Sequence, residues 1–87
     1  MDSTALMELL IEHEALLADG FEAALIGHVQ QGPTTLVALY DRAKCIEILM
    51  ARDGMSEDEA DEFFDFNVTG AWMGDKTPAF ATLATCQ

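Results

Sequence analysis

The sequence predicts a small α+β domain with elements in the order α-β-β-α-α-β. Apolar residues recur at helical spacing near the start of the chain and again after Tyr40. A run of strand-forming residues lies between these two helical segments. About half of the 87 residues are apolar, which is enough for one core. We therefore expect a single domain over residues 1–87, with an antiparallel sheet of two or three strands packed against helices.

The first predicted element is a helix over residues 4–18. Ser3 or Thr4 is placed to cap its N-terminus, and Asp19-Gly20 marks its end. His13 falls within the apolar face and is interpreted as a structural histidine at the helix edge. The other members of this face are Leu6, Leu9, Leu10, Leu16 and Leu17.

Residues 24–40 predict a β-hairpin. Residues 35–40 are rich in strand formers, and residues 30–33 (QQGP) have the composition of a turn. The preceding apolar run, residues 24–29, also suits a helix because it contains alanine and leucine. Its secondary structure is left open between strand and helix.

Residues 42–69 predict an αα-hairpin. Asp41 is placed to cap the first helix, and Gly54 to take the left-handed position after it. Ser56 and Glu59 have the spacing of a capping box at the start of the second helix. The apolar face of that second helix comprises Ala60, Phe63, Phe64, Asn67 and Val68, where the Asn67 amide is expected to hold backbone in the following loop.

Residues 71–84 predict a loop followed by a strand. Trp72 is an aromatic anchor in this loop, and residues 79–83 are expected to return as a third strand beside the hairpin. Trp72, Met73 and Phe80 have two interpretations: pieces of the core, or an apolar interface for a partner or for self-association.

The charge is strongly acidic, with 16 Asp and Glu against 4 Lys and Arg and a formal net charge of −12. Such a chain repels nucleic-acid phosphates and anionic membranes, so we expect neither as a direct partner. The charge favours a basic protein surface.

Catalytic and metal-binding motifs are absent from the sequence. Asp53-Gly54 lacks the ligand spacing of an EF-hand, and the histidines and cysteines lack zinc-site spacing. No nucleophile motif or phosphate-binding loop is present. We therefore expect a protein that is not an enzyme and that holds no metal or cofactor.

The cysteines and the N-terminus indicate the compartment. Cys45 is expected to be a buried thiol, and Cys86 lies next to the C-terminus, so the two form no disulfide framework. No basic region precedes the first apolar run, and no run approaches the ~20 apolar residues of a membrane span. These features predict a cytoplasmic protein.

The second helix of the αα-hairpin has a dense set of carboxylates. Acidic residues in its first turn favour the helix dipole, but the set continues well beyond that turn. It is either a docking face for a basic partner or a solvated surface. The candidate partner-binding residues are Glu57, Asp58, Asp61, Glu62 and Asp65.

Residues 40–80 resemble a group of small, uncharacterised proteins encoded by bacteriophages and prophages. The residues that carry the resemblance are Tyr40-Asp41, Cys45 to Leu49, Gly54-Met55-Ser56, Glu59-Ala60, Phe66-Asn67-Val68, Gly70-Ala71-Trp72 and Thr77-Pro78. With the similar segment at residues 24–28, it covers about residues 21–81. The resemblance implies a viral origin and carries no known activity.

Together these observations predict an acidic phage protein that binds a basic surface of a host protein or complex in the host cytoplasm. Its concrete form is an inhibitor of a nucleic-acid-binding or defence system, similar in role to an anti-CRISPR protein. The alternative is a homodimeric structural or assembly accessory protein of a phage, joined through the Trp72–Phe80 region or a sheet edge.

Overall fold

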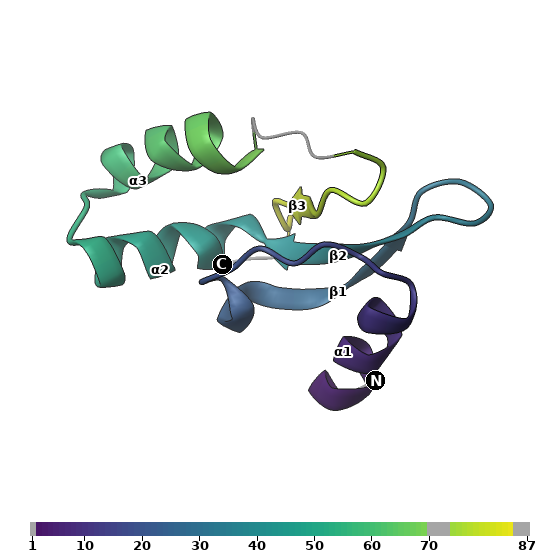
Figure 1. The fold of residues 1–87 in the computed structure, drawn as a ribbon. Helices are drawn as coiled ribbons and strands as arrows, with labels where there is room; N and C mark the ends of the chain where they lie inside the picture. Colours follow the sequence, from purple (N-terminus) through teal and green to yellow (C-terminus); the bar gives the residue numbers. More distant parts are fainter. Residues whose placement is uncertain (1, 70–73, 85–87) are drawn as a thin grey trace.

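The computed structural model describes residues 2–69 and 74–84, which form an α+β fold as predicted (Figure 1). A short 3₁₀ turn (η1) precedes the first strand, and a π-helical turn (η2) continues the third helix. The elements in chain order are α1 (Ser3–Glu12), η1 (Glu22–Ala24), β1 (Leu25–Gln30), β2 (Leu36–Asp41), α2 (Arg42–Asp53), α3 (Glu57–Phe64), η2 (Asp65–Thr69) and β3 (Ala79–Ala81).

The predicted first helix, residues 4–18, is wrong in its second half, because α1 ends at Glu12. Glu14 takes the left-handed conformation, with φ of 57°. The amide of Glu14 then donates to the Ile11 carbonyl at 3.0 Å, and that of Ala15 to the Leu10 carbonyl at 2.9 Å. This is the Schellman arrangement, in which a left-handed residue closes a helix. Periodicity alone does not show it, because leucines continue at helical spacing beyond the end.

Tertiary hydrogen bonds hold the segment that follows α1. The amide of Ala18 donates to the Tyr40 hydroxyl at 2.8 Å. The ammonium of Lys76 donates to the His13 carbonyl at 2.5 Å, so His13 serves through its backbone. At the other end of α1, Asp2 is the cap in place of the expected Ser3 or Thr4, since its carboxylate accepts from the Ala5 amide at 2.8 Å.

The predicted hairpin over residues 24–40 is confirmed, and its first apolar run is a strand. β1 and β2 pair antiparallel, with Gly27 opposite Leu39 and Val29 opposite Val37. The register shifts between Leu25 and Gly27, which leaves Ile26 as an extra residue on β1. Of residues 24–29, only Ala24 is helical, as the last residue of the η1 turn, and the rest form β1.

The third strand exists, but its direction corrects the predicted antiparallel sheet. The strand order is β1-β2-β3, and β3 lies parallel to β2, with Phe80 opposite Tyr40. The chain passes through α2 and α3 between these strands, far more than the dozen or so residues that a parallel crossover requires. This long return allows β3 to enter in the direction of β2, and the sheet is mixed.

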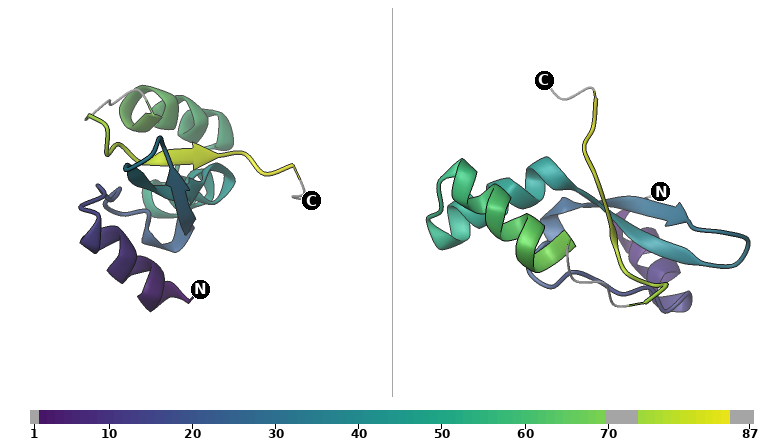
Figure 2. Two further views of the ribbon diagram at one scale, coloured as in Figure 1. Left: turned by 90° about the vertical axis from the view of Figure 1, so that its right-hand side faces the viewer. Right: turned by 90° about the horizontal axis from the view of Figure 1, so that it is seen from above.

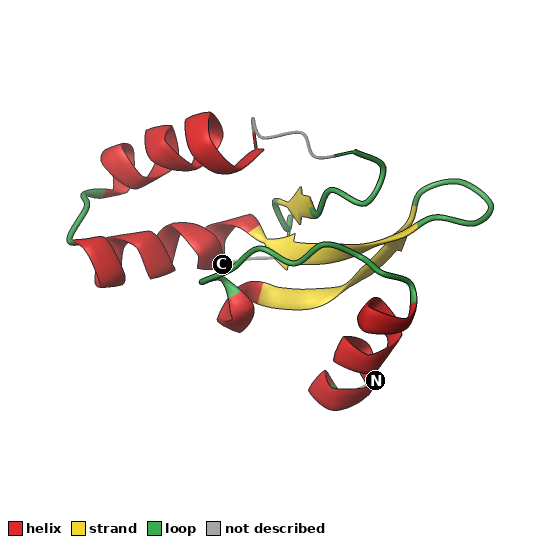
Figure 3. Cartoon of the chain, in the orientation of Figure 1, coloured by secondary structure: helices red, strands yellow, loops and turns green. Residues whose placement is uncertain are grey.

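The αα-hairpin over residues 42–69 is confirmed. The Asp41 carboxylate accepts from the Ala43 amide at 3.0 Å at the start of α2. Gly54 ends α2 with φ of 69°, a conformation that disfavours a side chain. In Figures 2 and 3, α3 lies on one side of α2 and the sheet, and α1 lies on the other.

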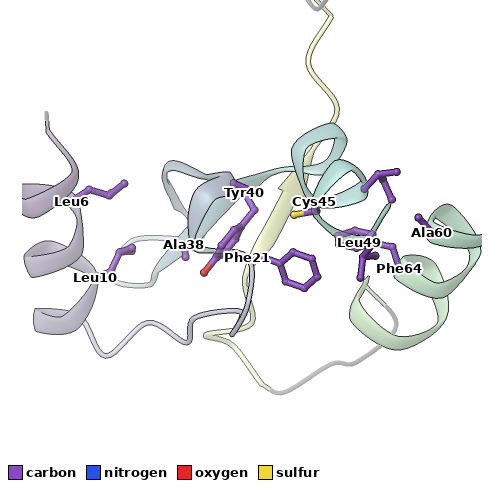
Figure 4. Packing of buried hydrophobic residues seen from close by; sticks show 11 residues of the cluster. Leu6, Leu10, Phe21, Ala38, Tyr40, Cys45, Leu49, Ala60 and Phe64 are labelled. Atoms are coloured by element: carbon purple, nitrogen blue, oxygen red, sulfur yellow. The ribbon is translucent and has the colours of Figure 1, made fainter. Parts of the chain in front are cut away.

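The core is a continuous row of side chains that runs from α1 through β2 to α2 and α3 (Figure 4). Its centre is aromatic: the Phe64 ring meets Phe21 and Phe80 edge-on, at centroid distances of 5.9 and 5.0 Å. Phe80 also stacks on Tyr40 at 5.5 Å. The buried members are Leu6, Leu10, Phe21, Ala24, Ala38, Tyr40, Cys45, Ile46, Leu49, Ala60 and Phe64. This core fixes which side of α3 faces inward and therefore which residues face outward.

Candidate docking surface

The N-terminus of α3 forms the predicted capping box. The Ser56 hydroxyl accepts from the Glu59 amide at 3.2 Å, and the Glu59 carboxylate accepts from the Ser56 amide at 2.9 Å. Glu57 and Asp58 complete an acidic first turn, where negative charge is favoured by the helix dipole. Part of the acidity of α3 is therefore structural.

The candidate carboxylates do not form one uniform face, because α2 supplies a cation to two of them. Arg42 makes ion pairs with Asp61 and, at 2.8 Å, with Asp65. Burial acts to lower the pKa of Arg42, but the hydrogen bonds to Asp65 and Asp61 outweigh it and the net pKa shift is upward. Arg42 is therefore always charged and partly neutralises both carboxylates.

The other three candidates remain exposed. Within residues 2–69 and 74–84, no ion pair involves Glu57, Asp58 or Glu62. The structure thus divides the predicted set into two paired and three free carboxylates.

Beside Glu62, an open groove of about 680 Å³ runs from the α2–α3 turn along α3. Two aromatic residues line it: Phe66 is 86% exposed, and Phe63 is 36% exposed. The remaining lining includes Met55, Glu59, Glu62 and Asn67. Large rings in water beside carboxylates suit a partner that is both basic and able to cover an aromatic surface.

Phe66 is the residue of this surface that the sequence reasoning missed. The chain has three phenylalanines within four positions, and Phe64 shares the buried side of α3 with Ala60. Phe66 follows Phe64 by two residues, which is about half a turn, so it points to nearly the opposite side of the helix. That geometry was the available signal, since one helix face cannot bury both rings.

Asn67 also differs from its prediction. It is exposed, and its amide donates back to the Phe63 carbonyl at 3.2 Å rather than to the following loop. The widened π-helical turn of η2 begins at Asp65, and turns of this kind recur at functional sites. Asn67 therefore helps to fix the end of α3 beside the groove.

The candidate apolar interface is only partly within the described residues. Trp72 and Met73 lie outside them. Phe80 is half-buried and packs against Tyr40 and Phe64. Its contacts favour the core interpretation over an exposed contact for a second copy.

The buried thiol of Cys45 is fully covered, as predicted. Burial, with a smaller contribution from Asp41, raises its pKa to about 11. The thiol is neutral at physiological pH and is not a nucleophile.

In the described part of the chain, no group of three or more His, Cys, Asp or Glu side chains is arranged to hold a metal ion. No described helix has the length and apolar character needed to cross a membrane.

No protein-family model matches the chain, and no curated protein or solved structure is significantly similar to it. The resemblance to small phage proteins therefore stays a prediction.

Proposed function

We propose that this protein is a non-enzymatic interaction protein that docks a basic surface of a partner protein onto α3. The observation that carries the proposal is the division of the α3 carboxylates: Arg42 pairs with Asp61 and Asp65, whereas Glu57, Asp58 and Glu62 are exposed without an ion pair among the described residues. A net charge of −12 adds long-range attraction for such a partner.

The resemblance to phage proteins supports a more specific form of this function. A viral protein of this charge would act in the host cytoplasm on a nucleic-acid-binding or defence complex, whose basic groove normally accepts phosphates. Carboxylates on a helix offer negative charge to the same groove. We propose inhibition of such a complex, as anti-CRISPR proteins achieve, as the biological role.

The test compares two triple variants with the same net charge. One carries Glu57→Lys, Asp58→Lys and Glu62→Lys on α3, and the other carries Glu8→Lys, Glu12→Lys and Asp75→Lys away from it. Each triple changes the net charge from −12 to −6, since every reversal adds two charges. Tagged wild-type and variant proteins are used to capture partners from bacterial lysate at low and high salt.

We expect the wild type and the second triple to retain a basic protein that elutes as the salt concentration rises. The α3 triple should lose it. Equal loss by both triples would show that net charge alone drives the capture, and equal retention by both would place the docking surface elsewhere.

A further inference from the structure

The protein contains its own example of how α3 holds a cation. The Arg42 guanidinium lies over the Phe64 ring, 5.0 Å from its centroid. Asp61 and Asp65 lie on either side of Phe64 in the sequence. The Asp61 carboxylate accepts a hydrogen bond from the same guanidinium, and Asp65 forms an ion pair with it. One ring and two carboxylates on adjacent turns thus bind one arginine, with a cation–π contact and charge-assisted hydrogen bonds.

A second guanidinium in the fold, that of Arg52, also lies over an aromatic ring. Arg52 lies over Phe21 at 5.7 Å and pairs with Asp53 at 3.1 Å. Both arginines of the chain therefore combine a phenylalanine face with a carboxylate.

The groove repeats this combination of groups without a cation of its own. Glu62 and Phe66 follow Asp61 and Asp65 by one residue each, so they lie about a quarter of a turn further round the helix axis. Phe66 stands one turn beyond Glu62, and Phe63 one turn beyond Glu59. All four line the groove, and its Asp53 is the carboxylate already paired with Arg52.

We infer that this groove binds an arginine side chain of the partner, with the guanidinium against Phe66, the more exposed of the two rings, and paired to Glu62. The arginine site rests on the proposed function and names the side chain that the basic partner contributes. Glu59 has a lesser part, since one of its oxygens already accepts from the Ser56 amide.

Arginine fits this groove better than lysine for a physical reason. A guanidinium is planar and weakly hydrated, so it stacks on an aromatic ring while its edge donates to a carboxylate. A lysine ammonium is a compact, strongly hydrated point charge, and it forms cation–π contacts less often than arginine does. The exposed rings therefore give the acidic surface a selectivity that carboxylates alone do not supply.

The experiment uses three short synthetic peptides: alternating glycine and arginine, the lysine counterpart of the same length and charge, and a neutral citrulline counterpart. Each is titrated into isotope-labelled protein at low salt, and binding is followed by NMR chemical-shift changes and by calorimetry. The variants are Phe66→Ala, Glu62→Gln and the control Ile11→Ala, which removes another exposed apolar side chain, 66% exposed on α1.

We expect the arginine peptide to bind wild type about two- to fivefold more tightly than the lysine peptide, the effect of an exposed cation–π contact. Phe66→Ala should remove this preference, and Glu62→Gln should weaken the binding of both charged peptides. Ile11→Ala should leave the preference and the binding of both peptides unchanged. The citrulline peptide should not bind measurably.

Three results would overturn the arginine site. The first is that the wild type binds the arginine and lysine peptides equally, and that Phe66→Ala also binds them equally. If the variant with Glu57, Asp58 and Glu62 changed to lysine then bound both charged peptides more weakly than the wild type, the proposed function would stand without the arginine site. The second is citrulline binding as strong as arginine binding. The third is no binding of any peptide.

Discussion

Arg42 is the residue on which the charge pattern of the acidic hairpin depends. Its side chain is 23% exposed, and it contacts two carboxylates and the Phe64 ring. Lys44 has the same charge on the same helix, but it lies 4.0 Å from Glu47 and is 51% exposed. The two cations therefore differ in how many groups of the fold each one contacts.

Replacing Arg42 with alanine should lower the free energy of unfolding by about 1–2 kcal/mol, from two ion pairs of about 0.2–1 kcal/mol each and one cation–π contact. The matched variant Lys44→Ala should change it by less than about 0.5 kcal/mol. Urea denaturation at low salt measures both. Equal effects would mean that the Arg42 contacts contribute little.

Cys45 gives the stability of the fold a dependence on alkaline pH. Its pKa is raised by burial from an ordinary 9.0 to about 11 in the folded protein, so the unfolded chain loses the thiol proton first. The stability contributed by the neutral thiol is complete below about pH 9 and is lost as the pH rises toward 11. Burial also raises the pKa of Tyr40, which acts in the same direction.

Urea denaturation of wild type from pH 8 to pH 10.5 should therefore show a loss of roughly 2 kcal/mol that Cys45→Ala lacks. The comparison of slopes isolates the thiol from tyrosine and lysine titration. Parallel slopes for the two proteins would indicate that the folded-state pKa of Cys45 is close to its ordinary value.

At the scale of elements, the end of α1 shows a residue in an unfavourable conformation. Glu14 occupies a left-handed position after a helix that is usually glycine, as it is at Gly54 at the end of α2. The left-handed residue that closes a helix is thus glycine at the end of α2 and glutamate at the end of α1.

Glu14→Gly should raise the free energy of unfolding by about 0.5–1 kcal/mol, because it relieves the left-handed conformation. Glu8→Gly, at an exposed position inside α1, should lower it by about 1 kcal/mol. Thermal and urea denaturation of the pair measure the two signs. A loss of stability in both would place the end of α1 elsewhere.

The elements that the sequence predicted well are those set by neighbouring residues. Asp41, Gly54 and the Ser56–Glu59 box act within one turn, so their residue types and spacing were sufficient. The direction of β3 was not predictable, because it depends on the path of the long connection through α2 and α3. The end of α1 was missed because glutamate carries no left-handed signal.

For the candidate site too, the sequence predicts what depends on neighbouring residues and not what depends on tertiary contacts. The carboxylates of α3 could be placed on a helix from spacing alone. Which of these carboxylates are paired could not be predicted, because the pairing depends on how close Arg42 lies to Asp61 and Asp65, which are far from it in the sequence. The exposed Phe66 follows from which phenylalanine the core selects.

For the whole molecule, the net charge of −12 acts against the compact state, since four cations oppose sixteen anions. Salt screens this repulsion over about 10 Å at 0.1 M. The melting temperature should therefore rise between low and moderate NaCl concentrations.

An increase of about 1 kcal/mol in the free energy of unfolding would raise the melting temperature by roughly 4–8 °C for a domain of this size. The triple variant with Glu57, Asp58 and Glu62 changed to lysine has half the net charge and should show a smaller rise. Calorimetry at several salt concentrations provides the measurement. A melting temperature that falls with salt would show that attractive ion pairs outweigh the repulsion.

The hydrogen bond from the Ala18 amide to the Tyr40 hydroxyl joins residues 22 positions apart and links the segment after α1 to β2. Its consequence appears in solvent exchange of backbone protons. The Ala18 proton should exchange slowly with deuterium while the segment after α1 stays docked on β2, although neighbouring loop amides exchange fast. In Tyr40→Phe, that proton alone should become fast while β2 amides stay slow. One amide thus records how often the N-terminal segment leaves the sheet, separately from opening of the sheet itself.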